Sequence, residues 1–283
     1  MNPLNFAISL VVLSGLFHAL WNICTKKSIN KEAFLFSVQL TSLIVFAPIC
    51  LPQIINGSFS TTALLLFAAT AFIHGLYFVL LARLYTIADL SQTYPIIRGS
   101  SLIIIPLCGV IFLGEKVSLI GWTGIAIIIA GIVSISKIKL SRLNHQILIL
   151  SLCVGVSIAL YVLVDKMALK YVDPVTLNQI GTAGNIIILL PFILQNRIQN
   201  LKNEWSKNYK LILIGAFLAP SSYMIFLYAI NTSPVSILAP IREIGTVFGA
   251  IIGVFFLKES NGRNRIISSI IITSGMILLG LFN

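Results

Sequence analysis

The sequence predicts an all-α, polytopic membrane protein with ten transmembrane helices arranged as two inverted five-helix repeats. Of its 283 residues, 58% are hydrophobic and only 10% are charged, and the mean hydropathy is +1.01. A soluble fold cannot bury that much apolar surface in one core. The apolar residues form long unbroken runs rather than an inward–outward alternation, which excludes a transmembrane β-barrel. The two halves of the chain also carry matching residues in the same order.

Ten apolar runs are each long enough to cross a hydrocarbon core of about 30 Å, since a helix rises about 1.5 Å per residue. In chain order they span residues 5–25, 33–55, 61–82, 91–113, 117–136, 146–169, 174–195, 210–231, 234–257 and 263–282. No basic residue precedes the first run and no small-residue cleavage pattern follows it, so we expect an uncleaved helix. Turn residues mark several of the short connections: Asn56-Gly57-Ser58, Asp173-Pro174, Ser233-Pro234 and Asn261-Gly262. The longest polar connection covers residues 197–210.

Matching polar and glycine residues recur between the halves at shifts of about 140 and 144 residues. The pairs are Gly15 and Gly155, Lys26 and Lys166, Arg98 and Arg242, Glu115 and Glu259, and Gly131 and Gly275. Such an ordered series does not arise easily by chance in apolar helices. Each half has five spans, and an odd number turns the second half over relative to the first. Residues 1–143 and 144–283 are therefore predicted to be inverted repeats, an architecture typical of secondary transporters.

The paired segments resemble a known family. They are residues 94–99 with 109–115, residues 240–243 with 256–259, and residues 18–22 with Lys26. These segments are similar to the drug/metabolite transporter superfamily, in its EamA-type ten-helix branch, and most to a subgroup with members associated with phosphonate use. The resemblance covers nearly the whole chain. It implies a fold and a transport function but no particular substrate, because the family exports amino acids, amines, sugars and drugs with similar helices.

The net charge of +11 comes mainly from Lys and Arg in the connections between runs. This placement indicates contact with anionic lipid headgroups and membrane topology rather than a nucleic-acid partner. Most of these basic residues follow odd-numbered runs, so the positive-inside rule places both termini outside the cytoplasm. The family resemblance implies instead that both termini are inside. Under either reading the termini share one side of a bacterial-type inner membrane.

Two arginines and one glutamate lie deep inside predicted spans. Arg98 and Arg242 are about seven and eight residues into the fourth and ninth runs, so they are expected to straddle the midplane. One reading is that at least one arginine binds an anionic group of a solute. The other is that Glu243 forms an ion pair with either arginine and fixes the packing. Glu243 is also a candidate proton-coupling site, whereas Asp165 and Lys166 are expected to extend from the end of the sixth run to the interface.

Two histidines and several aromatic residues form the rest of the candidate solute site. His18 and His74 are predicted to lie at one depth with Arg98, either as hydrogen-bonded helix partners or as a titratable lining. Both histidines are therefore further candidates for proton coupling. The other substrate-binding candidates are Trp21, Asn22, Tyr77 and Tyr94 near that layer, and Tyr161 and Tyr223 in the second half. The two histidines have no carboxylate or thiolate at ligand spacing, so no metal site is predicted.

No motif for hydrolytic, nucleotide-driven or cofactor-dependent chemistry is present, so we predict no enzyme activity and no cofactor. The sequence favours a secondary transporter, an exporter or proton-coupled exchanger of a small polar, anionic or zwitterionic metabolite. It would work by alternating access around a central cavity as a monomer or weak homodimer. The alternatives are a transporter of amines or cationic drugs with the same fold, and a membrane enzyme or scaffold that does not transport.

Overall fold

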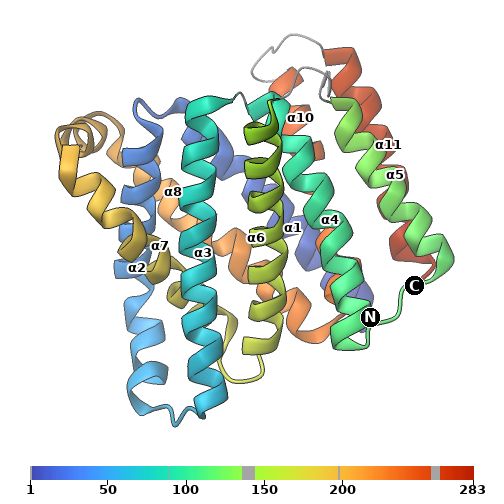
Figure 1. Cartoon of the computed structure of the whole chain (residues 1–283), viewed down its shortest axis with the longest axis horizontal. Coiled ribbons are helices and arrows are strands. Elements are labelled where there is room, and N and C mark those ends of the chain that lie inside the picture. The colour runs from blue at the N-terminus through green and yellow to red at the C-terminus, as the bar shows by residue number, and fades with distance from the viewer. Residues whose placement is uncertain (1, 89, 136–143, 197, 256–261) are drawn as a thin grey trace.

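The computed structural model describes residues 2–88, 90–135, 144–196, 198–255 and 262–283, and in these ranges all regular secondary structure is helical. The helices are α1 (Pro3–Lys27), α2 (Lys31–Asn56), α3 (Thr61–Ile87), α4 (Leu90–Leu113), α5 (Leu119–Ile135), α6 (His145–Ala168), α7 (Pro174–Asn196), α8 (Ile198–Thr232), α9 (Val235–Ile241), α10 (Ile244–Phe255) and α11 (Gly262–Leu281). Figure 1 shows them side by side as one bundle, with both termini at the same end. This arrangement agrees with the predicted placement of the termini on a common side.

Eight spans in the described residues are long and apolar enough to cross a membrane, and α9 and α10 together make one of them. The two remaining helices of the predicted ten are α5, which is shorter, and α7. Helix α7 has 23 residues, but it buries the polar side chains of Asn178, Gln179 and Asn185. Its polar residues thus face the protein interior and not lipid. The predicted all-helical, ten-span fold is confirmed.

The packing of the helices repeats itself when the two halves are exchanged. Helix α1 packs on α8, and α6, its counterpart in the second half, packs on α3. In the same way α4 packs on α6, while α10 packs on α1. The exchange leaves three contacts unchanged, those of α5 with α11, of α2 with α7 and of α4 with α9. This is the contact pattern of two repeats related by a pseudo-twofold axis, and each half supplies part of the interior of the other.

Glycines at repeat-related positions allow the closest helix contacts. A Cβ atom on Gly15 would lie 2.9 Å from the backbone nitrogen of Gly245, so only glycine lets α1 approach α10 this closely. A Cβ atom on Gly155 would lie 2.7 Å from the carbonyl oxygen of Ile97, where α6 crosses α4. Small residues that permit such backbone approach are typical of helix contacts in membranes. The predicted match of Gly15 with Gly155 therefore reflects equivalent packing.

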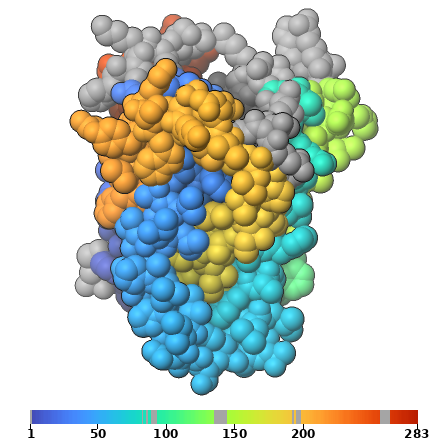
Figure 2. Space-filling model, turned by 90° about the vertical axis from the view of Figure 1, so that its left-hand side faces the viewer, coloured from blue at the N-terminus to red at the C-terminus, as the bar shows by residue number. Residues whose placement is uncertain are grey.

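The predicted connection at residues 197–210 is largely helical. Helix α8 begins at Ile198 and bends at Asn208, whose φ of −125° and ψ of 21° are not helical. The fully buried carboxylate of Glu204 explains why this segment is fixed. It accepts hydrogen bonds from the backbone nitrogens of Ile29 at 3.1 Å and Asn30 at 2.8 Å, where α2 begins. Figure 2 shows the segment in orange over the upper end of α2.

Candidate functional site

The ninth predicted span is broken in its middle, at a pair of charged residues. Helix α9 ends at Ile241 and α10 begins at Ile244, so Arg242 and Glu243 lie between them. Pro240 has no backbone N–H and cannot make the normal helical hydrogen bond. Beyond it the chain forms three-residue turns, with the nitrogen of Glu243 donating to the oxygen of Pro240 at 3.1 Å. A broken membrane helix is tolerated where it is buried in protein or lines a polar cavity.

Glu243 pairs with the arginine of the other repeat. Its Oε1 lies 3.2 Å from Nη1 of Arg98, and only 5% of the Glu243 side chain is exposed against 24% for Arg98. The Oγ1 of Thr246 donates to Oε2 of Glu243 at 2.9 Å and lies 2.7 Å from the hydroxyl of Tyr94. The Arg98 guanidinium is also 5.5 Å from the Tyr94 ring centroid. For Arg98, the structure thus shows the ion-pair alternative, which joins α4 to the break between α9 and α10.

Arg242 is held by aromatic rings instead of a carboxylate. Its guanidinium carbon lies 4.4 Å from the ring centroid of Phe226 and 5.0 Å from that of Tyr223, both on α8. Among the residues that the structure describes, no carboxylate is within ion-pair distance of Arg242. Stacking on aromatic faces offsets part of the cost of holding a cation in the interior, and the planar donor fork stays available. Arg242 can therefore accept an anionic group.

Asp165 is buried, and the expectation that it extends to the interface was wrong. Its side chain is 1% exposed. Its carboxylate accepts hydrogen bonds from the hydroxyls of Thr70 and of Tyr223, the latter at 2.6 Å. Nε2 of His74 lies 3.1 Å from Oδ2 of the same carboxylate. These three donors make burial of the carboxylate tolerable, so Glu243 is not the only carboxylate deep in a span.

Lys166 is half-buried and binds the end of a neighbouring helix. Its ammonium group donates to the carbonyl oxygens of Ile230 and of Ser233, the latter at 3.1 Å. These carbonyls lie at the end of α8, where helical partners are lacking. Lys166 therefore caps the C-terminal end of α8.

Aromatic rings connect the histidine and tyrosine candidates. The ring of Tyr161 stacks on that of His74, with centroids 4.2 Å apart and an interplanar angle of 32°. Tyr77 and Tyr223 contact Tyr161 edge to face at 5.7 and 6.0 Å. Helices α3, α6 and α8 each supply rings to this group, so both repeats build it. The four candidates His74, Tyr77, Tyr161 and Tyr223 are thus brought together.

The three candidates on α1 have different surroundings: His18 and Trp21 contact each other, and Asn22 is exposed. Nε1 of Trp21 donates to Nδ1 of His18 at 3.2 Å, which makes Trp21, rather than His74, the hydrogen-bond partner of His18. The predicted alternative of a hydrogen bond between the two histidines was therefore wrong. His18 and Trp21 thus form a separate aromatic pair on α1.

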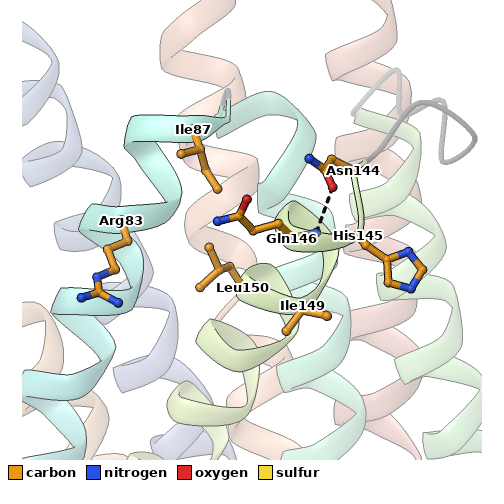
Figure 3. Close-up of a pocket in the computed structure, with 7 residues that line it drawn as sticks. All are labelled: Arg83, Ile87, Asn144, His145, Gln146, Ile149 and Leu150. Atoms are coloured by element: carbon orange, nitrogen blue, oxygen red, sulfur yellow. Dashed lines mark hydrogen bonds between the residues drawn. The ribbon is translucent and has the colours of Figure 1, made fainter.

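An open cleft of about 650 Å³ lies elsewhere, where α3 ends and α6 begins. Figure 3 shows its lining, which is Arg83, Ile87, Asn144, His145, Gln146, Ile149 and Leu150. None of these residues is among the candidate solute-binding or proton-coupling residues, so the cleft and the candidate site are distinct. In the described part of the chain, no group of three or more His, Cys, Asp or Glu side chains is placed to hold a metal ion.

Sequence reasoning placed Asp165 at the interface, although a signal for its burial in the site exists. Thr70 and His74 are four residues apart on α3, and Tyr161 and Asp165 are four residues apart on α6. Residues at this spacing share one face of a helix. Two such pairs, one on α3 and one on α6, would have indicated that these two helix faces contact each other through polar side chains.

Comparisons with known proteins agree with this architecture. The model of the EamA-like transporter family matches the chain twice, over residues 5–137 and 145–281. A search of curated proteins gives no match. Among solved structures, one titled "Crystal structure of protein" aligns with a TM-score of 0.76 and 14% identity, covering 98% of each chain. That similarity shows the fold alone. The two family matches together span most of the sequence, and the family is one of membrane transporters and not of enzymes. The chain therefore belongs to the EamA-like transporter family.

Proposed function

We propose that this membrane transporter moves a small anionic or zwitterionic metabolite by alternating access, with Arg242 as the anchor for the anionic group. The observation that supports the proposal most directly is the charge balance of the two arginines. Arg98 is paired with Glu243, whereas Arg242 rests on Phe226 and Tyr223. A guanidinium in that setting gains a charge-assisted, two-point contact when a carboxylate, phosphate or phosphonate binds.

The position of Arg242 also supports this role. It follows α9 at the break in the span, and binding sites of inverted-repeat transporters are typically built at such discontinuous helices. Rings of Tyr161 and Tyr223, and the His18–Trp21 pair, offer apolar and polar contacts for the rest of a solute. A site that combines a few placed polar groups with aromatic walls is typical for small metabolites.

Contacts between the repeats at one end of the bundle support alternating access. Glu115 of the first repeat accepts hydrogen bonds from the backbone nitrogens of Val235 at 2.9 Å and Ser236 at 2.8 Å, and so caps α9. Lys166 binds the adjacent end of α8 within the second repeat and fixes the same junction. The hydrogen bonds of Glu115 join the two repeats, so they have to break if the repeats rock against each other.

Other candidate functions are less well supported by the site. Cationic drugs or amines would be repelled by Arg242 unless Asp165 outweighed it. The resemblance to phosphonate-associated members supports a phosphonate as one possible anion and rests on sequence segments alone. A scaffold or enzyme with the same fold would bind a ligand without moving it.

Purified protein in liposomes separates these possibilities. We expect sulfate, phosphate, methylphosphonate or glutamate to raise the melting temperature by mass action, and the stabilising anion to cross the bilayer. Arg242→Ala should lose both effects. Arg263→Ala, which removes an exposed arginine at the start of α11, is the matched control. Stabilisation by a quaternary amine that is insensitive to Arg242→Ala would contradict the anion site, and binding without flux would contradict transport.

The orientation in the inner membrane is part of the proposal. The basic connections support a cytoplasmic location for residues 197–210 and an outside location for both termini. A single cysteine placed in residues 198–207 of a cysteine-free variant should then react with an impermeant reagent only after the cells are opened. Labelling in intact cells would support the reverse orientation.

A further inference from the structure

We propose that Asp165 and His74 together bind the coupling proton of this transporter, and that proton uptake by the pair strengthens anion binding at Arg242. The inference rests on the proposed function for its anion, but the proton site stands on its own geometry. Asp165 is on α6 of the second repeat and His74 on α3 of the first, with Nε2 and Oδ2 3.1 Å apart. The pair therefore lies across the interface that moves in alternating access.

The hydrogen bonds around Asp165 leave room for one exchangeable proton. The hydroxyls of Thr70 and Tyr223 donate to its carboxylate and occupy two acceptor positions. A neutral imidazole that donates from Nε2 leaves the pair with a net charge of −1. One proton taken up from water on the free ring nitrogen converts the pair to a carboxylate and an imidazolium, with net charge zero. No other bond forms or breaks, and the contact between the two side chains is kept.

Few charged groups surround the Asp165–His74 pair, so the uptake of one proton changes the local charge by one unit. The titratable groups that face the pair are Tyr77 on α3, Tyr161 on α6, Tyr223 on α8, and Arg242 after α9. The charge of Arg98 on α4 is balanced by Glu243. On the α7 side, Gly181 faces the His74 ring and brings no charge. Adjacent Lys166 is directed to the α8–α9 junction.

Tyr223 connects the proton site with the anion site. Its hydroxyl donates to Asp165 at 2.6 Å, and its ring face carries the Arg242 guanidinium at 5.0 Å. Without a bound proton, the charges of Asp165 and Arg242 sum to zero. With the proton, this part of the interior has one net positive charge, which an anion neutralises. A buried net charge is costly, so proton and anion stabilise each other, and by linkage the effect is reciprocal.

The proton site is tested without any solute. Protein in liposomes on a solid-supported electrode is given a step in pH, and the transient current reports proton binding. We expect a current for the wild type and for Asp173→Asn, a matched change at the cap of α7, where Asn caps equally well. Asp165→Asn should give only the signal of empty liposomes, because an imidazolium on His74 would then be a buried charge without a counter-ion. A wild-type current in Asp165→Asn, or no current in the wild type, would overturn the proposal.

A second variant covers the case in which Asp165→Asn does not fold. His74→Gln keeps the carboxylate and an N–H donor but removes the ring nitrogen that takes up the proton. The proton must then bind the Asp165 carboxylate itself, so the current should reach half its maximum at a different pH from that of the wild type, and an unchanged midpoint would overturn the pairing. The link to the anion is measured with sulfate, whose charge is constant over the pH range. We expect sulfate to bind about tenfold more tightly at low than at high pH in the wild type, and Asp165→Asn to abolish that ratio. If the currents behave as expected while no anion binds, the anion proposal fails and the proton site remains.

Discussion

Helix α4 and the broken span α9–α10 are equivalent elements of the two repeats, yet they use their matched arginines differently. Arg98 lies within a continuous helix, pairs with Glu243 and makes a cation–π contact with the Tyr94 ring. Arg242 lies at a break, on two rings of α8 and without a carboxylate in ion-pair distance among the described residues. One arginine is thus part of the connection between repeats, and the other keeps its charge available.

The cause of the difference lies in two neighbouring positions. At the shift that aligns the arginines, Gly99 in the first repeat matches Glu243 in the second, so only the second repeat provides a carboxylate. That carboxylate reaches across the interface to Arg98. Pro240 stands two residues before Arg242 and interrupts the helix there, whereas Pro95 stands near the beginning of α4, which stays continuous. Inverted repeats can therefore keep one fold while their sites diverge.

Arg242→Ala should have the largest effect on anion binding. A smaller effect would contradict the different roles assigned to Arg242 and Arg98. We expect anion binding to weaken about 100-fold, because a charge-assisted hydrogen-bond pair of roughly 3 kcal/mol is lost. The melting temperature without ligand should also fall, but modestly, since the contacts with the Phe226 and Tyr223 rings and the charge that balances Asp165 are lost. Arg242→Lys should restore binding only in part, because an ammonium lacks the planar fork. Affinity is measured by calorimetry with the anion that stabilises the wild type.

Arg98→Ala should act mainly on stability. It leaves the buried Glu243 carboxylate without its partner, and we expect the free energy of unfolding to fall by about 2 kcal/mol. This is less than for a fully buried pair, because Arg98 keeps 24% of its side chain exposed. The double variant Arg98→Ala with Glu243→Gln should recover most of the loss in a thermal denaturation series. Equal stability of Arg98→Ala and the wild type would show that the ion pair contributes nothing.

Glu243→Gln sharpens the distinction between an ion pair and a proton carrier. Arg98 is partly exposed and can be solvated when the carboxylate is replaced, so the expected loss of stability is only about 1 kcal/mol. The proton-binding current should remain, because Asp165 and His74 are unchanged. Disappearance of the current in a folded Glu243→Gln protein would transfer the proton site to the Arg98–Glu243 pair, the alternative that the sequence allowed.

Tyr94→Phe should give the smallest effect. The hydroxyl of Tyr94 is 2.7 Å from Oγ1 of Thr246, which in turn donates to Glu243. Loss of this one neutral hydrogen bond is expected to cost about 0.5–1 kcal/mol, with anion affinity unchanged. Thermal denaturation and anion titration of the same preparation check both values. A weakening of anion binding as large as that of Arg242→Ala would place Tyr94 in the solute site.

The fold was predictable because its signals are local in sequence. Apolar runs long enough to span a bilayer predict helices, and the ordered match of residues such as Arg98 with Arg242 predicts the repeat. The break at Arg242 was only partly predictable, because a proline such as Pro240 interrupts helical hydrogen bonding but does not by itself separate two helices. The helical character of residues 198–207 was missed because its stability comes from a buried contact of Glu204 with the start of α2.

By itself the sequence determined which helices form, how the two halves are related and which polar residues lie within the spans. It did so because apolar length, repeat matches and the cost of burying charge are properties of single segments. Only the tertiary structure decided which charges meet. It paired Arg98 with Glu243, left Arg242 on aromatic rings, and buried Asp165 against His74 and Tyr223. Such pairings depend on rotations and crossings of helices from different repeats, and these are set by the packing of the whole bundle.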